Sequence, residues 1–136
     1  MALTLAVGNK ELERQATLSF GQRDYKVFLA MNPGGLTADS EASLWLEAEL
    51  SFVTSPGYIS WVGTLGLPYP DPATGQLVFP PITAIFQAEG DWTWDTVCVW
   101  LTGEPYLHSA NVEAPARTLS SGAIAAYNLS IAQSVA

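Results

Sequence analysis

The longest regular pattern of hydrophobic positions runs through residues 91–101, DWTWDTVCVWL. Successive side chains of a β-strand point to opposite faces. One predicted face carries Trp92, Trp94, Thr96, Cys98 and Trp100, and the other carries Asp91, Thr93, Asp95, Val97, Val99 and Leu101. The first face is apolar throughout, while the second begins polar and ends apolar. The pattern predicts a strand that enters at a rim and runs into a core between two sheets.

Further short runs of β-branched, aromatic and alternating residues predict other strands, and with the central one they make about eight. They cover residues 25–31, 44–53, 58–65, 76–79, 82–88, 106–110 and 123–131. The side chains predicted to face inward include Tyr25, Val27, Leu29, Met31, Ile59, Trp61, Leu65, Tyr127, Leu129 and Ile131. Turns rich in glycine and proline separate these runs. The sequence therefore predicts an all-β fold, a β-sandwich or jelly roll.

Residues 44–53 fit two kinds of secondary structure. Their Leu, Glu and Ala residues favour a helix, whereas apolar and polar positions alternate with a period of two over nearly the whole run. We let the period outrank the propensity and predict a strand. One face of that strand would carry Leu44, Leu46, Ala48, Leu50 and Phe52.

The remaining segments organise the chain as one β-rich domain over residues 1–136. Residues 1–7 are apolar and suit an arm or an edge strand. Residues 9–18 suit one short N-terminal helix, with Asn9 at the N-cap. Residues 67–81 are rich in proline, which stiffens the backbone and removes donors. We expect this stretch to project as a rigid loop that carries Tyr69.

The charge of the chain argues against some classes of binding partner. Charged residues make up 13% of the chain, about half of the usual ~25%, and the formal net charge is −8. An acidic protein repels phosphate backbones, so we expect no nucleic-acid partner. No apolar run approaches the ~18 residues of a membrane span, and the first seven residues lack the basic start of a signal peptide. We therefore expect neither a membrane partner nor secretion.

Candidate chemistry is sparse. A zinc site built from Cys and His is excluded, because the chain has one cysteine, Cys98, and one histidine, His108. Neighbouring strands could bring these two together, but a thiol among tryptophans is inert. Asp91 and Asp95 would lie about 13 Å apart along a strand, too far for a glycosidase pair. We expect no enzymatic activity, metal or cofactor.

The order of short motifs resembles a group of small β-rich virion proteins of tailed bacteriophages. The motifs are YKVFLA at 25–30, SPGY at 55–58, GDW at 90–92, YLHSA at 106–110, LSSG at 119–122 and YNLSI at 127–131. The resemblance spans most of the chain and carries over no catalytic residue. It implies a non-enzymatic protein that is made in the host cytoplasm and resides in the virion.

Within the virion the resemblance implies a capsid decoration (cement) protein that stabilises the head through contacts with the major capsid protein. A tail, baseplate or tail-fibre adaptor component is the alternative. A homo-oligomer, with a trimer favoured, is expected. The candidate partner contacts are Leu3, Leu5, Val7, Tyr69 and Phe79. A carbohydrate-binding module is a further alternative. It would be favoured if Trp45 or Trp61 lay exposed in a shallow groove.

Overall fold

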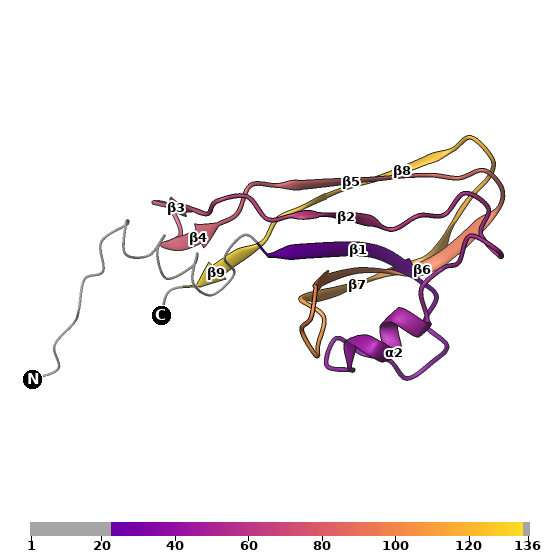
Figure 1. The fold of residues 1–136 in the computed structure, drawn as a ribbon, viewed down its shortest axis with the longest axis horizontal. Helices are drawn as coiled ribbons and strands as arrows, with labels where there is room; N and C mark the ends of the chain where they lie inside the picture. Colours follow the sequence, from indigo (N-terminus) through magenta and orange to yellow (C-terminus); the bar gives the residue numbers. More distant parts are fainter. Residues whose placement is uncertain (1–22, 135–136) are drawn as a thin grey trace, which may run out of the picture. The chain divides into compact units, whose positions relative to one another are not determined.

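The computed structural model describes residues 23–134, which form nine strands and one helix (Figure 1). In chain order these are β1 (Asp24–Ala30), α2 (Ala42–Glu47), β2 (Trp61–Thr64), β3 (Tyr69–Asp71), β4 (Gln76–Val78), β5 (Ile82–Gln87), β6 (Trp92–Leu101), β7 (Ser109–Leu119), β8 (Ile124–Leu129) and β9 (Ala132–Ser134). The prediction of an all-β fold is confirmed. The predicted arm at 1–7 and helix at 9–18 lie outside the described residues.

The chain divides into two compact units. The larger unit consists of residues 24–63 and 83–127. The described part of the smaller unit consists of Arg23 and residues 64–82 and 128–134.

The larger unit is built around one four-stranded sheet with the order β2-β1-β6-β7. β6 pairs antiparallel with β1 from Tyr25↔Leu101 to Ala30↔Thr96, and with β7 on its other side. β5 and β8 form a second, two-stranded sheet. In Figure 1 this pair lies on one side of the larger sheet and α2 lies on the other. The central strand therefore has a layer over each face.

Both faces of β6 and β1 are consequently buried. Tyr25, Val27 and Leu29 are buried, as the alternation of the sequence predicts. Phe28 and Ala30, on the opposite face, are fully buried as well. They pack in a hydrophobic cluster with Ala42, Trp45, Cys98 and Leu107. The predicted inward position of Met31 is wrong, because the chain leaves the sheet at Ala30 and the Met31 side chain is exposed.

A register shift divides the predicted tryptophan face of β6. Between the pairs Trp94↔Arg117 and Thr96↔Val112, β6 advances by two residues (96 − 94) and β7 by five (117 − 112), so β7 holds three extra residues. Such a bulge bends and twists the strands locally.

On either side of this shift the β6 side chains meet different partners. Trp92 lies edge-on to the Tyr58 ring at 5.5 Å, and the Trp94 Nε1 donates to the Tyr127 hydroxyl at 3.0 Å. Cys98, by contrast, belongs to the cluster under α2. The prediction that all five residues share one face is therefore wrong.

The predicted strand at 44–53 is also wrong, because its first part is helix α2. Ala42 and Trp45 are buried at a helical spacing of three, and the Trp45 Nε1 donates to the Thr37 carbonyl at 2.9 Å. Phe52, predicted to face inward, is exposed. Helix propensity prevailed here because the segment covers a sheet face, where a helix presents its apolar stripe. Residues 48–50 then run beside the C-terminal end of β1, where Leu50 N donates to Leu29 O at 2.9 Å.

The smaller unit contains a three-stranded sheet of order β3-β4-β9. The proline-rich stretch that was predicted to be a projecting loop forms its first hairpin, with Tyr69 opposite Val78. Pro70 is accommodated because β3 is an edge strand, where a missing donor is tolerated. Phe79 N donates to Ile131 O at 2.9 Å, and both side chains are buried. The inward positions predicted for Tyr127, Leu129 and Ile131 agree with their partial or full burial.

The cluster under α2 gives a test of the corrected helix. Trp45 is 1% exposed, whereas its neighbour Leu44 is 44% exposed. We expect Trp45→Ala to lower the free energy of unfolding by about 3–5 kcal/mol, because it empties the space over Phe28 and Cys98. Leu44→Ala, the matched control, should lower it by less than about 1 kcal/mol. Chemical denaturation monitored by circular dichroism measures both, and equal losses would contradict this helix orientation.

Candidate functional site

One surface feature of the larger unit is a shallow groove of about 340 Å³ between the segment that precedes β2 and strand β5. We call it the Ile59 groove. It is lined by apolar Ile59, Trp61, Ile85, Phe86 and Trp92 and by polar Ser60, Gln87 and Glu89. Ile59 is 78% exposed, Ile85 is exposed and Trp61 is partly exposed, whereas Phe86 and Trp92 are buried. The groove thus has an apolar floor and two exposed isoleucines.

The loop before β2 fixes one wall of this groove. The Pro56 carbonyl accepts from the Trp92 Nε1 at 2.7 Å and from the Glu89 backbone N at 3.0 Å. Gly57 has a φ of +80°, and a Cβ there would lie 2.6 Å from the Cγ of Glu89. Glycine is therefore required at this position both by the conformation and by the close approach. The Tyr58 ring then stacks on Phe86 with a centroid distance of 6.2 Å.

A partly buried polar network holds Tyr58 in place beside the Ile59 groove. The Tyr58 hydroxyl donates to the Glu49 Oε2 at 2.7 Å and accepts from the Leu29 backbone N at 3.0 Å. The other Glu49 oxygen lies 2.6 Å from the Lys26 Nζ. Burial, and secondly the nearby Glu49 carboxylate, raise the pKa of Tyr58 well above its usual value. The phenol remains a neutral donor, so this network has a structural role.

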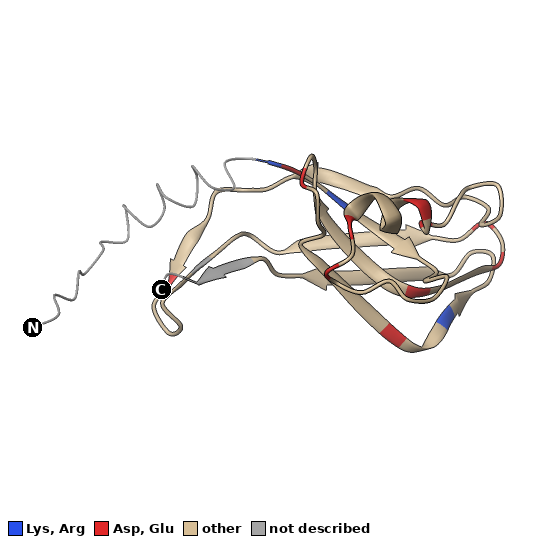
Figure 2. Ribbon diagram, turned by 90° about the horizontal axis from the view of Figure 1, so that it is seen from below, with Lys and Arg blue, Asp and Glu red and all other residues tan. Residues whose placement is uncertain are grey.

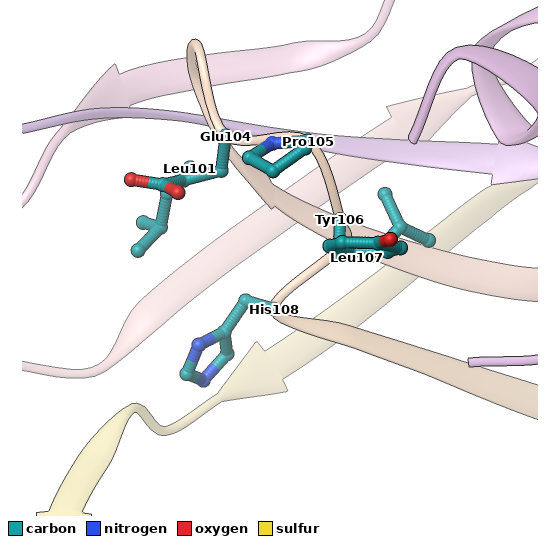
Figure 3. A pocket seen from close by; sticks show the side chains of 6 residues that line it. All are labelled: Leu101, Glu104, Pro105, Tyr106, Leu107 and His108. Carbon is teal, nitrogen blue, oxygen red and sulfur yellow. The ribbon is translucent and has the colours of Figure 1, made fainter. Parts of the chain in front are cut away.

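A second hollow, of about 230 Å³, follows the turn after β6 (Figure 3). Glu104, Tyr106 and His108 contribute to its lining. Desolvation lowers the pKa of His108. In Figure 3 the Glu104 carboxylate lies beside Leu101 and apart from the His108 ring.

Two side chains that the sequence offers for chemistry, Cys98 and Asp95, are buried or hydrogen-bonded within the fold. Cys98 is fully buried, and burial raises the pKa of its thiol to about 12. His108 lines the second hollow, while its backbone N bonds to Val99 O at 2.8 Å. The Asp95 Oδ1 accepts from the Asn32 N at 2.9 Å and from the Thr96 hydroxyl at 3.0 Å. Within the described part of the chain, no cluster of three or more His, Cys, Asp or Glu residues could hold a metal ion.

The predicted partner contacts have different outcomes. Tyr69 is 47% exposed on the edge strand β3, and Leu67 beside it is also exposed. The prediction that Phe79 anchors a partner is wrong, because its side chain is buried. Leu3, Leu5 and Val7 lie outside the described residues. The predicted inward position of Ile59 is wrong as well, since β2 begins only at Trp61.

Sequence reasoning missed the Ile59 groove, although one of its rims had a readable signal. β5 reads ITAIFQ with strict alternation of buried and exposed positions. That period of two places Ile85 on the outer face, together with Thr83 and Gln87. The alternation could have placed Ile85 on the surface, but a single exposed apolar residue is common, and a contact surface is indicated only together with the exposed Ile59.

No protein-family model matches the chain, and neither a curated protein nor a solved structure matches it. In the described residues no helix is long and apolar enough to cross a membrane. Charged residues are few and scattered along the described ribbon (Figure 2). The Ile59 groove has one charged lining residue, Glu89. Strand β3, which we call the Tyr69 strand, carries one charged residue, Asp71. Both are thus partly apolar surfaces on a weakly charged β protein.

The buried cysteine gives a test of the site description. At pH 8 a thiol with a pKa of about 12 is almost wholly protonated, and the thiolate is the reactive form. We expect Cys98 to react with a disulfide reagent at least about 100-fold more slowly in the native protein than in denaturant. Absorbance of the released thiolate measures both rates. Fast labelling of the native protein would show that Cys98 is accessible and would contradict its position under α2.

Proposed function

We propose that this chain is a non-enzymatic structural protein of a bacteriophage virion. Its role is that of a capsid decoration (cement) protein that stabilises the head through contacts with the major capsid protein. The resemblance in motif order to small phage virion proteins gives the biological setting. The observation that carries the proposal is the exposure of large apolar side chains on two surfaces, the Ile59 groove and the Tyr69 strand.

The Tyr69 strand is the better candidate for contact with the shell. Tyr69 and Leu67 are exposed next to Pro68 and Pro70, which limit the backbone freedom lost on binding. Tyrosine is enriched among the residues that dominate interface energies, because it buries a large rigid area and keeps one polar group. No charged residue occurs from 58 to 70, and Asp71 is the one carboxylate of β3, so docking through Tyr69 and Leu67 places few charges at the contact.

Glycan binding is the second candidate, and Trp61 is the specific observation in its favour. Trp61 is partly exposed and lines the Ile59 groove beside Ser60, Gln87 and Glu89. An aromatic face with nearby hydrogen-bonding groups is a common arrangement for holding a sugar. Trp45, the other tryptophan considered for this role, is buried under α2. The two exposed isoleucines of the groove favour an apolar protein partner over a sugar.

Tyr69→Ala tests the shell contact, and Tyr106→Ala is its matched control because the two tyrosines are 47% and 52% exposed. We expect the wild-type protein to bind expanded shells of the phage that encodes it and to raise their melting temperature. Tyr69→Ala should weaken binding by about 2 kcal/mol, or roughly 30-fold in Kd. Tyr106→Ala should bind as the wild type does. Co-sedimentation with shells gives the Kd, and calorimetry gives the melting temperature.

Two results would contradict the proposal. One is a wild-type protein that neither sediments with the shells nor changes their melting temperature. The other is an equal loss of binding for both tyrosine variants. Quenching of tryptophan fluorescence by an oligosaccharide that persists in Tyr69→Ala and disappears in Trp61→Ala would establish the glycan-binding alternative.

A further inference from the structure

Among residues 23–134 the four-stranded sheet ends at two edge strands, β2 and β7. The two strands differ in the features that hinder pairing with another strand. An edge strand presents backbone donors and acceptors to which another strand can pair. Natural proteins protect such edges with charged side chains, prolines and bulges, or by keeping the strand short. The two edges can therefore be compared within one sheet.

The β7 edge carries three of these protections. Pro115 lies within the strand and provides no backbone donor. The register shift places three extra residues between Val112 and Arg117. Glu113 and Arg117 put two charged side chains on the strand, with the Arg117 Nε 3.6 Å from the Glu113 Oε2. Pairing of a foreign strand along β7 is therefore unfavourable.

Of these protections the β2 edge has its short length of four residues. Residues 58–67, which contain β2, include no charged residue and no proline. Val62 is 68% exposed on the strand, and Ile59 is still more exposed just before it. Ile85 of β5 adds a further exposed isoleucine across the Ile59 groove. This edge combines a neutral strand with an adjacent apolar surface.

We propose that β2 is a self-association edge, at which two copies of this chain pair antiparallel about a two-fold axis. In such a pair the groove of each copy would be covered along the joined edge. Identical edges are self-complementary in an antiparallel two-fold arrangement, since each residue i that meets j is matched by j meeting i. This inference goes beyond the proposed function and does not depend on binding to a shell.

Charge argues for a second copy at this edge in particular. Each chain has a formal net charge of −8, so two copies repel one another over most of their surfaces. The stretch 58–67 has no carboxylate, and Glu89 is the one charged residue that lines the adjacent groove, so few like charges meet where two β2 edges pair. Screening by salt should therefore strengthen the pairing, and the dimer dissociation constant should fall as ionic strength rises.

Val62→Lys tests the proposal, with Val112→Lys as the matched control. Both valines lie on edge strands of the same sheet, and they are 68% and 70% exposed. In a two-fold pair the lysine introduced into one copy would lie close to the lysine introduced into the other. Val62→Lys should therefore raise the dimer dissociation constant at least about tenfold, whereas Val112→Lys should leave it unchanged. Sedimentation equilibrium of the full chain at two ionic strengths measures these constants.

Three results would overturn the proposal: a wild-type monomer over the whole concentration range, a trimer in place of a dimer, or equal weakening by the two lysine substitutions. Hydrogen exchange of the wild-type protein supplies a readout that needs no variant. Backbone amides of residues 58–64 should exchange more slowly in the concentrated than in the diluted protein. Exchange that is independent of concentration would contradict pairing at β2. Shell binding is scored separately, so failure of one proposal is distinguishable from failure of the other.

Discussion

The larger unit depends on the burial of strand β6 on both of its faces. A strand in this position needs an apolar layer above and below, and aromatic and β-branched side chains supply most of the buried area. Trp92 and Trp94 contact aromatic residues beside β5 and β8, while Cys98 meets the cluster beneath α2. The helix and the two-stranded sheet therefore lie where the two faces of β6 require cover.

The same constraint determines which surfaces remain available for partners. Because the two central strands, β1 and β6, are largely buried, the sheet offers its edge strands, β2 and β7, to polypeptide partners. The extra residues, Pro115 and the charged pair protect β7. β2 lies beside the Ile59 groove and has no charged neighbour in sequence from 58 to 67. The surfaces that we propose for assembly are thus the edge and hairpin surfaces that the core leaves uncovered.

The sequence predicted the fold class and the position of β6, because an uninterrupted run of aromatic and β-branched residues is a local signal. It did not predict the division of the tryptophan row, because the cause is non-local: the extra residues lie in β7, on a strand further along the chain. It also failed at 44–53, where an alternating pattern coincided with a helix. There the deciding factor was the uncovered sheet face around Phe28, which the segment's own periodicity does not encode.

Among the candidate contacts too, a local sequence signal correctly predicted an exposed side chain, and long-range pairing led to a wrong prediction. Tyr69 was identified because prolines beside an aromatic residue indicate a stiff surface segment, and it is exposed. Phe79 was misassigned because its neighbouring prolines suggested a loop, whereas its backbone pairs with Ile131 from the far end of the chain. The groove between Ile59 and Ile85 brings together two distant segments, and neither segment alone indicates a hollow.

The central claim is that the chain is a decoration protein of a phage head, and its copy number in purified virions tests this most directly. Quantitative mass spectrometry with labelled peptide standards would give the ratio of this chain to the major capsid protein. The account predicts a ratio of the same order as one, because a decoration protein occupies sites repeated over the whole shell. A few copies per particle, or none, would contradict it.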